Sequence, residues 1–342
     1  MYSVLVVAPA WVGDSVMAQP LYRLLAERHP DLALDVLAPG WTLPLLQRMP
    51  EVRNAIENPF AHGQLRLGAR RALGVALRNE NYDQAIVLPN SLKSALIPWF
   101  ANIPRRTGFV GEMRYGLLND ARKLDAAALP LMVERFAVLA GDRGEPLRRP
   151  VAPPRMLVER QQAAAVAAQL GLTLDRPAVA FCPGAEYGPA KRWPVEHFAS
   201  LAQKLVADGC QVWIFGSGKD REIGTAIATL AGLKQVINLA GRTGLDQAVD
   251  LLALAAVVVT NDSGLMHVAA ALERPIVALF GSSSPGFTPP LSERAQVLSL
   301  NLACSPCFKR ECPLGHLDCL NKLLPEQVLR AVRQALQQYS AG

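Results

Sequence analysis

The chain has 342 residues, of which 51% are hydrophobic and 19% are charged. This composition excludes a disordered protein, and the length is sufficient for two domains that each bury a core. The formal net charge is +6, and no stretch approaches the roughly 18 consecutive apolar residues of a membrane-spanning helix, so we expect a soluble globular protein.

The first residues, MYSVLVVAPAW, predict a buried strand at Val4–Ala8. They contain no basic segment and reach Gly13 and Asp14 too early for a secretory signal peptide. We therefore expect a cytoplasmic protein whose six cysteines stay reduced.

Strands and helices alternate in the first half of the chain, which predicts a parallel sheet with right-handed crossovers. An amphipathic helix is expected at Val16–Arg28. The other expected elements are strands at Ala33–Leu37 and Gln84–Leu88, and helices at Leu43–Met49, Leu67–Asn79 and Ser91–Phe100.

Asp14 lies between the first strand and the first helix, with Gly13 beside it. A carboxylate held at the end of a parallel strand can accept a proton from a hydroxyl nucleophile. Gly13 suggests that an acceptor substrate approaches the backbone closely. The alternative is that Asp14 only caps the helix.

The positive charge is concentrated between Phe60 and Lys123, where ten Lys or Arg face four Asp or Glu. This region predicts a basic face for an anionic partner, with a scattered solvated surface as the alternative. Anionic lipid is favoured over nucleic acid, because aromatic residues are sparse there and no nucleic-acid motif is present. The arginines and lysine expected on this face are Arg66, Arg70, Arg71, Arg78, Arg105, Arg106, Arg114, Arg122 and Lys123.

Glu145–Arg155 holds four prolines in eleven residues and predicts a linker. We expect an N-terminal domain at residues 1–155 and a C-terminal domain at residues 156–324, with a ligand in the cleft between them. A last helix, Pro325–Tyr339 within the tail 325–342, is expected to pack back across the linker. Further elements are expected as helices at Val158–Leu170, Val195–Asp208 and Asp246–Ala255 and strands at Ala178–Cys182 and Gln211–Phe215.

The loop Phe181–Pro194, FCPGAEYGPAKRWP, follows the first strand of the second domain. Its glycines and prolines stiffen it, so that Lys191 is aimed at a phosphate. A charged surface loop is the alternative. Gly184, Glu186 and Tyr187 are the other candidate binding residues of this loop.

Ala255–Gly281 predicts a βαβ unit with strands at Val257–Thr260 and Ile276–Phe280. The turn Asn261–Gly264 ends the first strand, and the helix Leu265–Leu272 follows, where free backbone N–H groups favour an anion. Ser263 or Asp262 can cap the helix, Gly264 permits close approach, and His267 lies one turn further on. Asp262 is expected to contact hydroxyl groups, so a sugar phosphate suits the turn. An ordinary strand-to-helix turn is the alternative.

Two other glycine-containing stretches, Phe215–Asp220 and Leu239–Thr243, follow strands but lack a full dinucleotide or Walker A pattern. No D-x-D pair occurs, which argues against a carboxylate-held metal. We expect neither a metal nor a cofactor.

Cys304, Cys307, Cys312 and Cys319 fall within sixteen residues, with His316 among them. Their spacing is compatible with a zinc site but is not that of paired C-x2-C knuckles. Reduced structural thiols and disulfides are the alternatives.

Four motifs in order, the Gly13-Asp14 turn, PGAEYGPAKRWP, NDSGLMH and CSPCFKRECPLGHLDC, resemble the ADP-heptose:lipopolysaccharide heptosyltransferases of glycosyltransferase family 9. The resemblance spans nearly the whole chain. It implies the GT-B fold, an α/β arrangement of two Rossmann-like domains with doubly wound parallel sheets. It also implies that the acceptor binds to the first domain (residues 1–155) and the sugar nucleotide to the second (residues 156–324).

The resemblance also implies residue roles. Asp14 matches the general base, Lys191 the lysine on the donor diphosphate, and Asp262 the aspartate that holds the heptose. Other members have hydroxyl residues where this chain has Glu186-Tyr187. The remaining matches are Ser263, Gly264 and His267 in the diphosphate-binding turn and Thr243 at the adenine.

The implied reaction is metal-independent, inverting transfer of L-glycero-D-manno-heptose from ADP-heptose to the first heptose of the lipopolysaccharide inner core. The implied acceptor, phosphorylated heptosyl-Kdo2-lipid A, supplies an anionic partner for Arg70, Arg71 and Arg78, together with the cytosolic surface of the inner membrane. Heptosyltransferase I or another ADP-heptose transferase, a sugar-nucleotide epimerase and a small-molecule binding protein are the alternatives.

Overall fold

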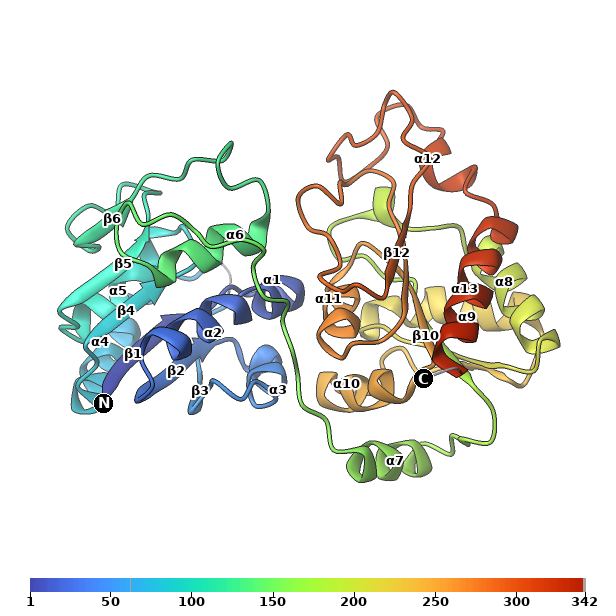
Figure 1. Cartoon of the computed structure of the whole chain (residues 1–342), viewed down its shortest axis with the longest axis horizontal. Helices are drawn as coiled ribbons and strands as arrows, with labels where there is room; N and C mark the ends of the chain where they lie inside the picture. Colours follow the sequence, from blue (N-terminus) through green and yellow to red (C-terminus); the bar gives the residue numbers. More distant parts are fainter. Residues whose placement is uncertain (62, 341–342) are drawn as a thin grey trace. The chain divides into compact units, whose positions relative to one another are not determined.

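A computed structural model describes residues 1–61 and 63–340 of the chain. The chain forms two compact units, Met1–Pro154 and Arg155–Gly342 (Figure 1). The division falls inside the proline-rich stretch Glu145–Arg155, and the last two residues of the expected tail lie outside the described residues.

The first unit is built on a six-stranded parallel sheet in the order β3-β2-β1-β4-β5-β6. Its strands are β1 (Tyr2–Val7), β2 (Leu32–Ala38), β3 (Asn54–Glu57), β4 (Gln84–Val87), β5 (Arg105–Phe109) and β6 (Asp120–Arg122). Its α-helices are α1 (Val12–Met17), α2 (Gln19–Arg28), α3 (Leu43–Leu46), α4 (Leu67–Ala76), α5 (Leu92–Phe100) and α6 (Met132–Ala137). Short 3-10 helices lie at Gly40–Thr42, Leu77–Glu80 and Val138–Ala140.

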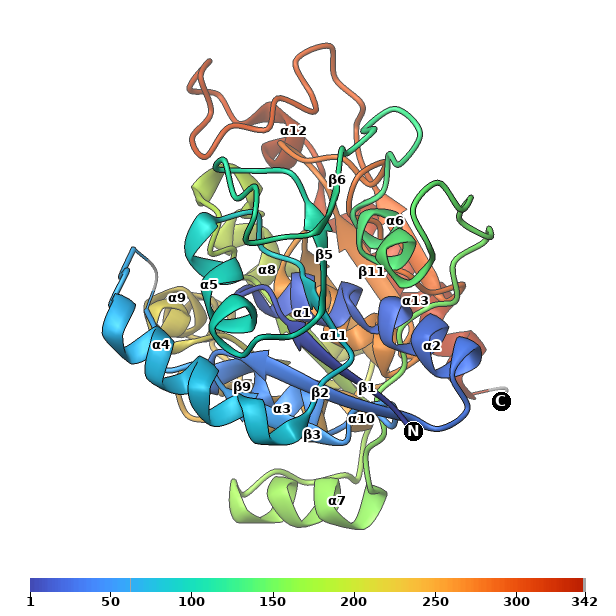
Figure 2. The ribbon, with the colours of Figure 1, turned by 90° about the vertical axis from the view of Figure 1, so that its left-hand side faces the viewer.

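Both faces of this sheet are covered, which explains why Val4–Val7 of β1 and Ala85–Val87 of β4 are all apolar. Leu5 and Val7 of β1 belong to the core that includes Ala95 and Ile97 of α5. Helices α4 and α5 pack against each other, and α2 packs against α6 (Figure 2).

The second unit has a parallel sheet in the order β12-β11-β10-β7-β8-β9. If the strands are numbered from β7 and the sheet is read from β9 to β12, the order is the same as in the first unit. Its strands are β7 (Ala178–Cys182), β8 (Gln211–Ile214), β9 (Val236–Asn238), β10 (Val257–Asn261), β11 (Ile276–Leu279) and β12 (Ala295–Leu298). Its helices are α7 (Arg160–Gln169), α8 (Val195–Ala207), α9 (Arg221–Ala231), α10 (Leu245–Leu254), α11 (Gly264–Ala271), α12 (Asp318–Asn321) and α13 (Pro325–Ser340), with 3-10 turns at Pro189–Lys191 and Gly218–Asp220.

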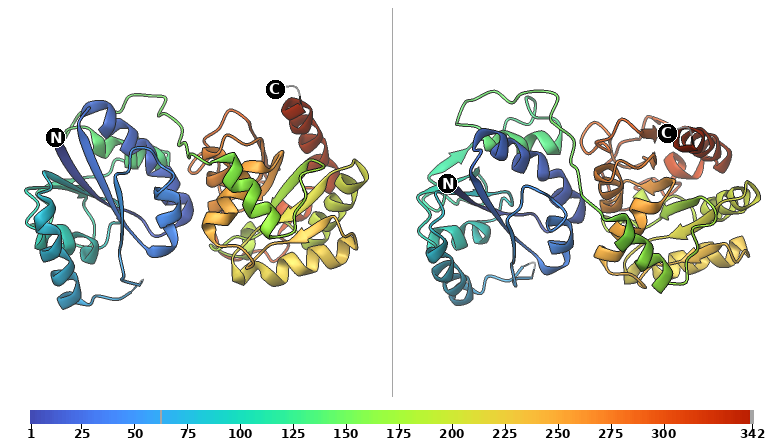
Figure 3. Two further views of the ribbon diagram at one scale, coloured as in Figure 1. Left: turned by 90° about the horizontal axis from the view of Figure 1, so that it is seen from below. Right: turned by 60° about the horizontal axis from the view of Figure 1, so that its bottom comes forward.

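Helices also cover both faces of the second sheet. α8, α9 and α13 share a core with β7, β8 and β10, whereas α7 lies alongside α10 (Figure 3). The predicted doubly wound parallel sheets are therefore confirmed in each unit.

The last helix, α13, packs against α8, β10 and β11 of the second unit. Val328 and Val332 on its inner face are fully buried in that unit's core. The structure thus gives α13 a place in the second unit, and the expected packing across the linker stays a prediction.

Two local predictions were wrong. The single helix expected at Val16–Arg28 begins earlier and is divided at Ala18 into α1 and α2, with Pro20 in the first turn of α2. The short strands β3, β5, β6, β9 and β12 were not expected, because strands of three to five residues at or next to a sheet edge carry little apolar pattern.

Candidate functional site

Strand order reverses between β7 and β10 in the second unit, where neighbouring strands lead to helices on opposite faces. Ligands of doubly wound sheets bind outside the carboxyl ends of the strands at such a switch point. β7 and β10 are directly paired, with Cys182 opposite Thr260. The loop that follows β7 and the turn that follows β10 therefore lie at the same sheet edge.

Asn261 holds this loop and this turn together. Its side-chain amide donates to the Pro183 carbonyl at 2.7 Å, and its Oδ1 accepts from the Trp193 backbone N–H at 3.1 Å. Both ends of the loop are thereby fixed to the turn, a positioning role that the sequence reasoning missed because Asn261 was assigned only to the turn.

Lys191 and Asp262 form an ion pair, with 2.5 Å between Nζ and Oδ2. The Lys191 side chain is 17% exposed and that of Asp262 is 5% exposed. Buried charges require such pairing. The lysine expected at a diphosphate and the carboxylate expected at sugar hydroxyls are thus brought into direct contact.

His267 lies on the first turns of α11 and is buried. Burial lowers its pKa to about 4, with a smaller lowering from Lys191 and an opposing effect of Asp262. The imidazole is therefore neutral at physiological pH and brings hydrogen-bonding capacity without charge.

Ser263 is the N-cap of α11, but no side-chain capping bond is formed. Its hydroxyl lies 3.3 Å from the Thr260 hydroxyl instead. The first backbone N–H groups of α11 are consequently free of a side-chain cap, as an anion-binding helix terminus requires.

Two serines after β11 extend the candidate site. The hydroxyls of Ser282 and Ser283 are buried and have no hydrogen-bond partner within the residues that the structure describes. β11 pairs with β10, so these hydroxyls follow the neighbouring strand at the same edge of the sheet. The sequence reasoning missed them because a run of serines after a strand is also ordinary turn composition.

Tyr187 ties the Lys191 loop to the cysteine-containing segment. Its hydroxyl donates to the Phe308 carbonyl at 2.8 Å, and its own carbonyl accepts from Arg310 Nε at 2.7 Å. The cation of Lys191 lies 5.1 Å from the centre of the Tyr187 ring, and that of Arg310 lies 5.4 Å from it. Tyr187 therefore supports the loop from which Lys191 projects.

Glu186 pairs with Lys219 at 2.5 Å, which joins the same loop to the segment after β8. Gly184 lies against that segment as well, since a Cβ there would meet Asp220 Oδ1 at 2.5 Å. Thr243 follows β9 at the same edge of the sheet. Contact of Gly184, Glu186, Tyr187 and Thr243 with a donor stays a prediction.

Gly188 offers a test of this support. A Cβ at Gly188 would meet the Arg310 carbonyl oxygen at 2.5 Å, so Gly188→Ala must push the Lys191 loop away from residue 310. We expect the KM for ADP-heptose, the donor that the resemblance implies, to rise about tenfold, or about 1.4 kcal/mol of binding free energy, because the Lys191 ammonium is displaced from the predicted phosphate site. Gly218→Ala is the matched control, because nothing lies within 4 Å of a Cβ there. Equal kinetics for the two variants would contradict a supporting role.

Asp14 occupies the equivalent switch point of the first unit. It lies in the first turn of α1, directly after β1, where the strand order reverses between β1 and β4. Gly13 beside it is buried, and the Trp41 indole donates to the Ala10 carbonyl at 3.0 Å. Asp14 is half-buried and sits within α1, not in the turn expected before it.

The expectation that Arg70 lies on an exposed basic face is wrong. Arg70 is 3% exposed, and its guanidinium lies 4.2 Å from the centre of the Phe60 ring. It donates to the carbonyls of Gln64, Leu65 and Lys93. Burial lowers its pKa. Arg70 therefore fixes the start of α4, whereas Arg71 and Arg78 are exposed.

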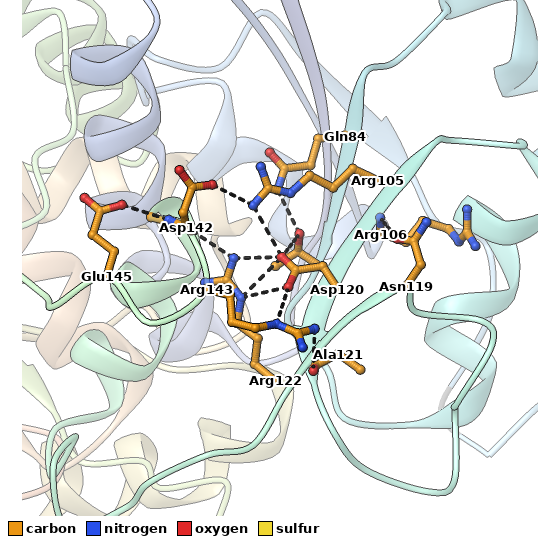
Figure 4. A network of polar contacts seen from close by, with 12 residues as sticks. Gln84, Arg105, Arg106, Asn119, Asp120, Ala121, Arg122, Asp142, Arg143 and Glu145 are labelled. Atoms are coloured by element: carbon orange, nitrogen blue, oxygen red, sulfur yellow. Dashed lines mark hydrogen bonds and ion pairs between the residues drawn. The ribbon is translucent and has the colours of Figure 1, made fainter.

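Other arginines of the basic region are also engaged inside the first unit (Figure 4). Asp120 accepts from Arg105, Arg122 and Arg143. Burial opposes ionisation of Asp120, but the hydrogen bond and charge of Arg122, with further help from Thr107 and Arg105, lower its pKa to about 2. Arg106 donates to backbone carbonyls, as does the buried Arg114. These arginines are therefore not available to the expected basic face, because their guanidinium groups are engaged with Asp120 and with backbone carbonyls of the first unit.

The four clustered cysteines are free thiols, so the disulfide alternative is wrong. They line one small cavity of about 20 Å³ together with His316. Backbone hydrogen bonds, that of Leu317 foremost, lower the pKa of Cys312, whereas burial raises that of Cys319. Among residues 1–61 and 63–340, no three His, Cys, Asp or Glu side chains are gathered as a metal site.

The glycosyltransferase family 9 (heptosyltransferase) model matches residues 70–318. The chain belongs to this family. Its 51% identity to lipopolysaccharide heptosyltransferase 2 of Salmonella typhimurium spans 97% of this chain and 98% of that protein. The solved structure of Escherichia coli ADP-heptose LPS heptosyltransferase II superimposes with a TM-score of 0.91, at 49% identity, over 99% of this chain and 100% of that one.

These similarities confirm the prediction of a family 9 glycosyltransferase with the GT-B fold. Lipopolysaccharide heptosyltransferase 1 of Pseudomonas aeruginosa is only 30% identical, over 90% of this chain and 87% of that protein. The comparisons therefore favour the heptosyltransferase II function over the alternatives. None of the helices in the described part of this family member is long and apolar enough to cross a bilayer.

Proposed function

We propose that this chain transfers L-glycero-D-manno-heptose from ADP-heptose to the first heptose of the lipopolysaccharide inner core, as a heptosyltransferase II. The observation that carries the proposal is the Lys191–Asp262 pair at the switch point of the second unit. It joins a cation suited to a diphosphate with a carboxylate suited to sugar hydroxyls. The 51% identity to lipopolysaccharide heptosyltransferase 2 supports the same assignment.

In this proposal the donor diphosphate lies at the N-terminus of α11. The free N–H groups after Ser263, and the absence of a side chain at Gly264, support this role. The ammonium of Lys191 has three N–H donors, so it can keep its bond to Asp262 and still donate to a phosphate oxygen. The neutral His267 adds no charge that would hold the product ADP more tightly.

Asp14 is proposed as the general base. The acceptor hydroxyl loses its proton to the Asp14 carboxylate while its oxygen forms a bond to the anomeric carbon of heptose. The bond between that carbon and the diphosphate oxygen breaks, and ADP leaves with the electron pair. One direct displacement of this kind inverts the anomeric centre and needs no protein nucleophile.

We expect the reaction to be independent of added metal. Charge that develops on the leaving diphosphate is compensated by Lys191 and by the N–H groups of α11, and the sequence contains no D-x-D pair. Turnover in an excess of EDTA over enzyme should equal turnover with Mg²⁺. Activity that disappears with EDTA and returns with Mg²⁺ would contradict this mechanism.

The acceptor is proposed to be phosphorylated and lipid-anchored, as heptosyl-Kdo2-lipid A, so the enzyme would act peripherally at the cytosolic surface of the inner membrane. Arg71 and Arg78 support this proposal because they remain exposed. Arg70 is removed from the proposed acceptor contacts, since its guanidinium is engaged with Phe60 and three carbonyls.

The decisive experiment incubates the purified chain with ADP-heptose, with and without acceptor. Heptosyl transfer predicts that the acceptor gains the mass of one heptose and that ADP is released in equal amount. Altered ADP-sugar without acceptor would indicate an epimerase. Retention of tightly bound ADP-heptose without turnover would indicate a binding protein.

A further inference from the structure

Helix α4 presents an unusual surface to solvent. No Asp or Glu occurs between Phe60 and Asn79, although most of the described residues in this stretch are exposed. Leu65 is 53% exposed and Leu67 is 51% exposed, and the side chain of Val75 is also exposed. Ordinary solvated helices carry charged residues of both signs on their outer face, so an apolar and purely basic outer face is not explained by solvation.

The end of α5 adds an exposed tryptophan to this surface. Trp99 is 43% exposed. α4 packs closely on α5 because residue 74 is glycine, whose missing Cβ leaves room for the Phe100 Cβ. Arg78 Nε donates to the Phe100 carbonyl at 2.9 Å, which places Arg78 beside the residue next to Trp99. Figure 2 shows the two helices side by side.

The buried Arg70 holds this surface rigid. Its guanidinium bonds to the carbonyls of Gln64 and Leu65, at the start of α4, and to that of Lys93 on α5. The hydrogen bonds of Arg70 therefore hold the backbone at the start of α4, where the side chains of Leu65 and Leu67 are exposed. We name the exposed set Leu65, Arg66, Leu67, Arg71, Val75, Arg78 and Trp99 the α4 face.

We propose that the α4 face docks on an anionic lipid bilayer. Leucine and tryptophan side chains at an interface enter the boundary between headgroups and acyl chains, and the arginines beside them bind anionic headgroups. The proposal rests on the peripheral membrane contact proposed above. It goes further because it names the surface that binds the membrane and the charge of the lipid to which that surface binds.

The test measures binding of the full chain to phosphatidylcholine vesicles with and without phosphatidylglycerol, in the absence of any lipopolysaccharide. We expect binding only to the anionic vesicles, weakened by salt because the attraction is screened over about 8 Å at physiological ionic strength. Arg71→Glu and Leu67→Glu should each lower vesicle affinity about tenfold. Leu67→Glu should leave turnover of a short, soluble acceptor unchanged.

Matched controls lie in the second unit. Leu230 on α9 is 52% exposed, nearly as Leu67 is, and Lys234 after the same helix is exposed. Leu230→Glu and Lys234→Glu introduce the same charge changes and should leave vesicle affinity unaltered. Brominated phosphatidylglycerol should quench tryptophan fluorescence of the wild type, and Trp99→Phe should abolish the quenching.

The outcomes separate the two proposals. Absence of wild-type binding to anionic vesicles would overturn the peripheral contact itself, and the α4 face with it. Wild-type binding that all the α4 face variants retain, or quenching that persists in Trp99→Phe, would overturn only the α4 face. Equal binding to neutral vesicles would overturn the role of lipid charge.

Discussion

Replacing Asp14 with Asn should lower kcat by about 10² to 10⁴, the usual contribution of a positioned general base, and leave the Kd for ADP-heptose unchanged. The amide fills the same space as the carboxylate but cannot take the proton of the acceptor hydroxyl. Because Asp14 lies in the first unit and the candidate donor site in the second, donor affinity has no reason to follow the loss of turnover.

The measurement is single-turnover kinetics with saturating donor, together with calorimetric titration of ADP-heptose. Asp31→Asn is the control, since it makes the same chemical change at an exposed residue before β2. A thermal melt excludes unfolding of α1 as the cause. A loss in turnover below tenfold would remove Asp14 as the base and leave it a structural residue of the first helical turn.

The sequence predicted the buried parts of this fold well because burial leaves a pattern. β1, β4, β7 and β10 each contain a run of at least three consecutive apolar residues, as strands covered on both faces do, and each was expected within two residues of its observed bounds. Edge strands leave no such pattern. The edge strand β6 begins with Asp120, and β5 beside it begins with Arg105. The charged side chains of these two strands pair within the unit, so the arginines were wrongly expected on the surface.

Arg70 illustrates the same limit at a single residue. Three arginines on one predicted helix favour an exposed basic face, and two of them are exposed. Whether an arginine turns inward depends on a ring and carbonyls supplied by Phe60 and Lys93, which lie too far along the chain for a local pattern to reveal. A guanidinium satisfied by three carbonyls is stable when buried, and only the folded structure supplies those partners.

The candidate site was accessible from sequence where its residues sit in strand-to-helix turns. Asp14, Lys191 and the turn 261–264 were chosen because each follows an apolar strand, and the structure places each at a switch point. The sequence could not reveal that Lys191 pairs with Asp262, because the two residues lie 71 positions apart along the chain. The support of the Lys191 loop by Tyr187 and Arg310 likewise depends on a contact between segments more than a hundred residues apart.

The Lys191–Asp262 pair leads to the second large prediction. Lys191→Ala should weaken ADP-heptose binding about a hundredfold and also lower kcat, because the variant loses the cation and leaves the Asp262 carboxylate buried and unpaired. That carboxylate would then repel the diphosphate. A hundredfold loss corresponds to about 2.7 kcal/mol, at the upper end of the roughly 1.5–3 kcal/mol that one hydrogen bond to a charged group supplies.

A double-mutant cycle separates these two effects. Asp262→Asn in the Lys191→Ala background removes the unpaired charge, so donor affinity should recover by about tenfold although a second site residue has been changed. Kd for ADP, which lacks the heptose, should recover at least as much as Kd for ADP-heptose, because the amide restores the diphosphate environment without restoring the sugar contact of the carboxylate. Lys204→Ala, which breaks the exposed pair with Glu326, should change neither constant. Additive losses for Lys191→Ala and Asp262→Asn would mean that the two residues act on the donor independently, and that their ion pair is only structural.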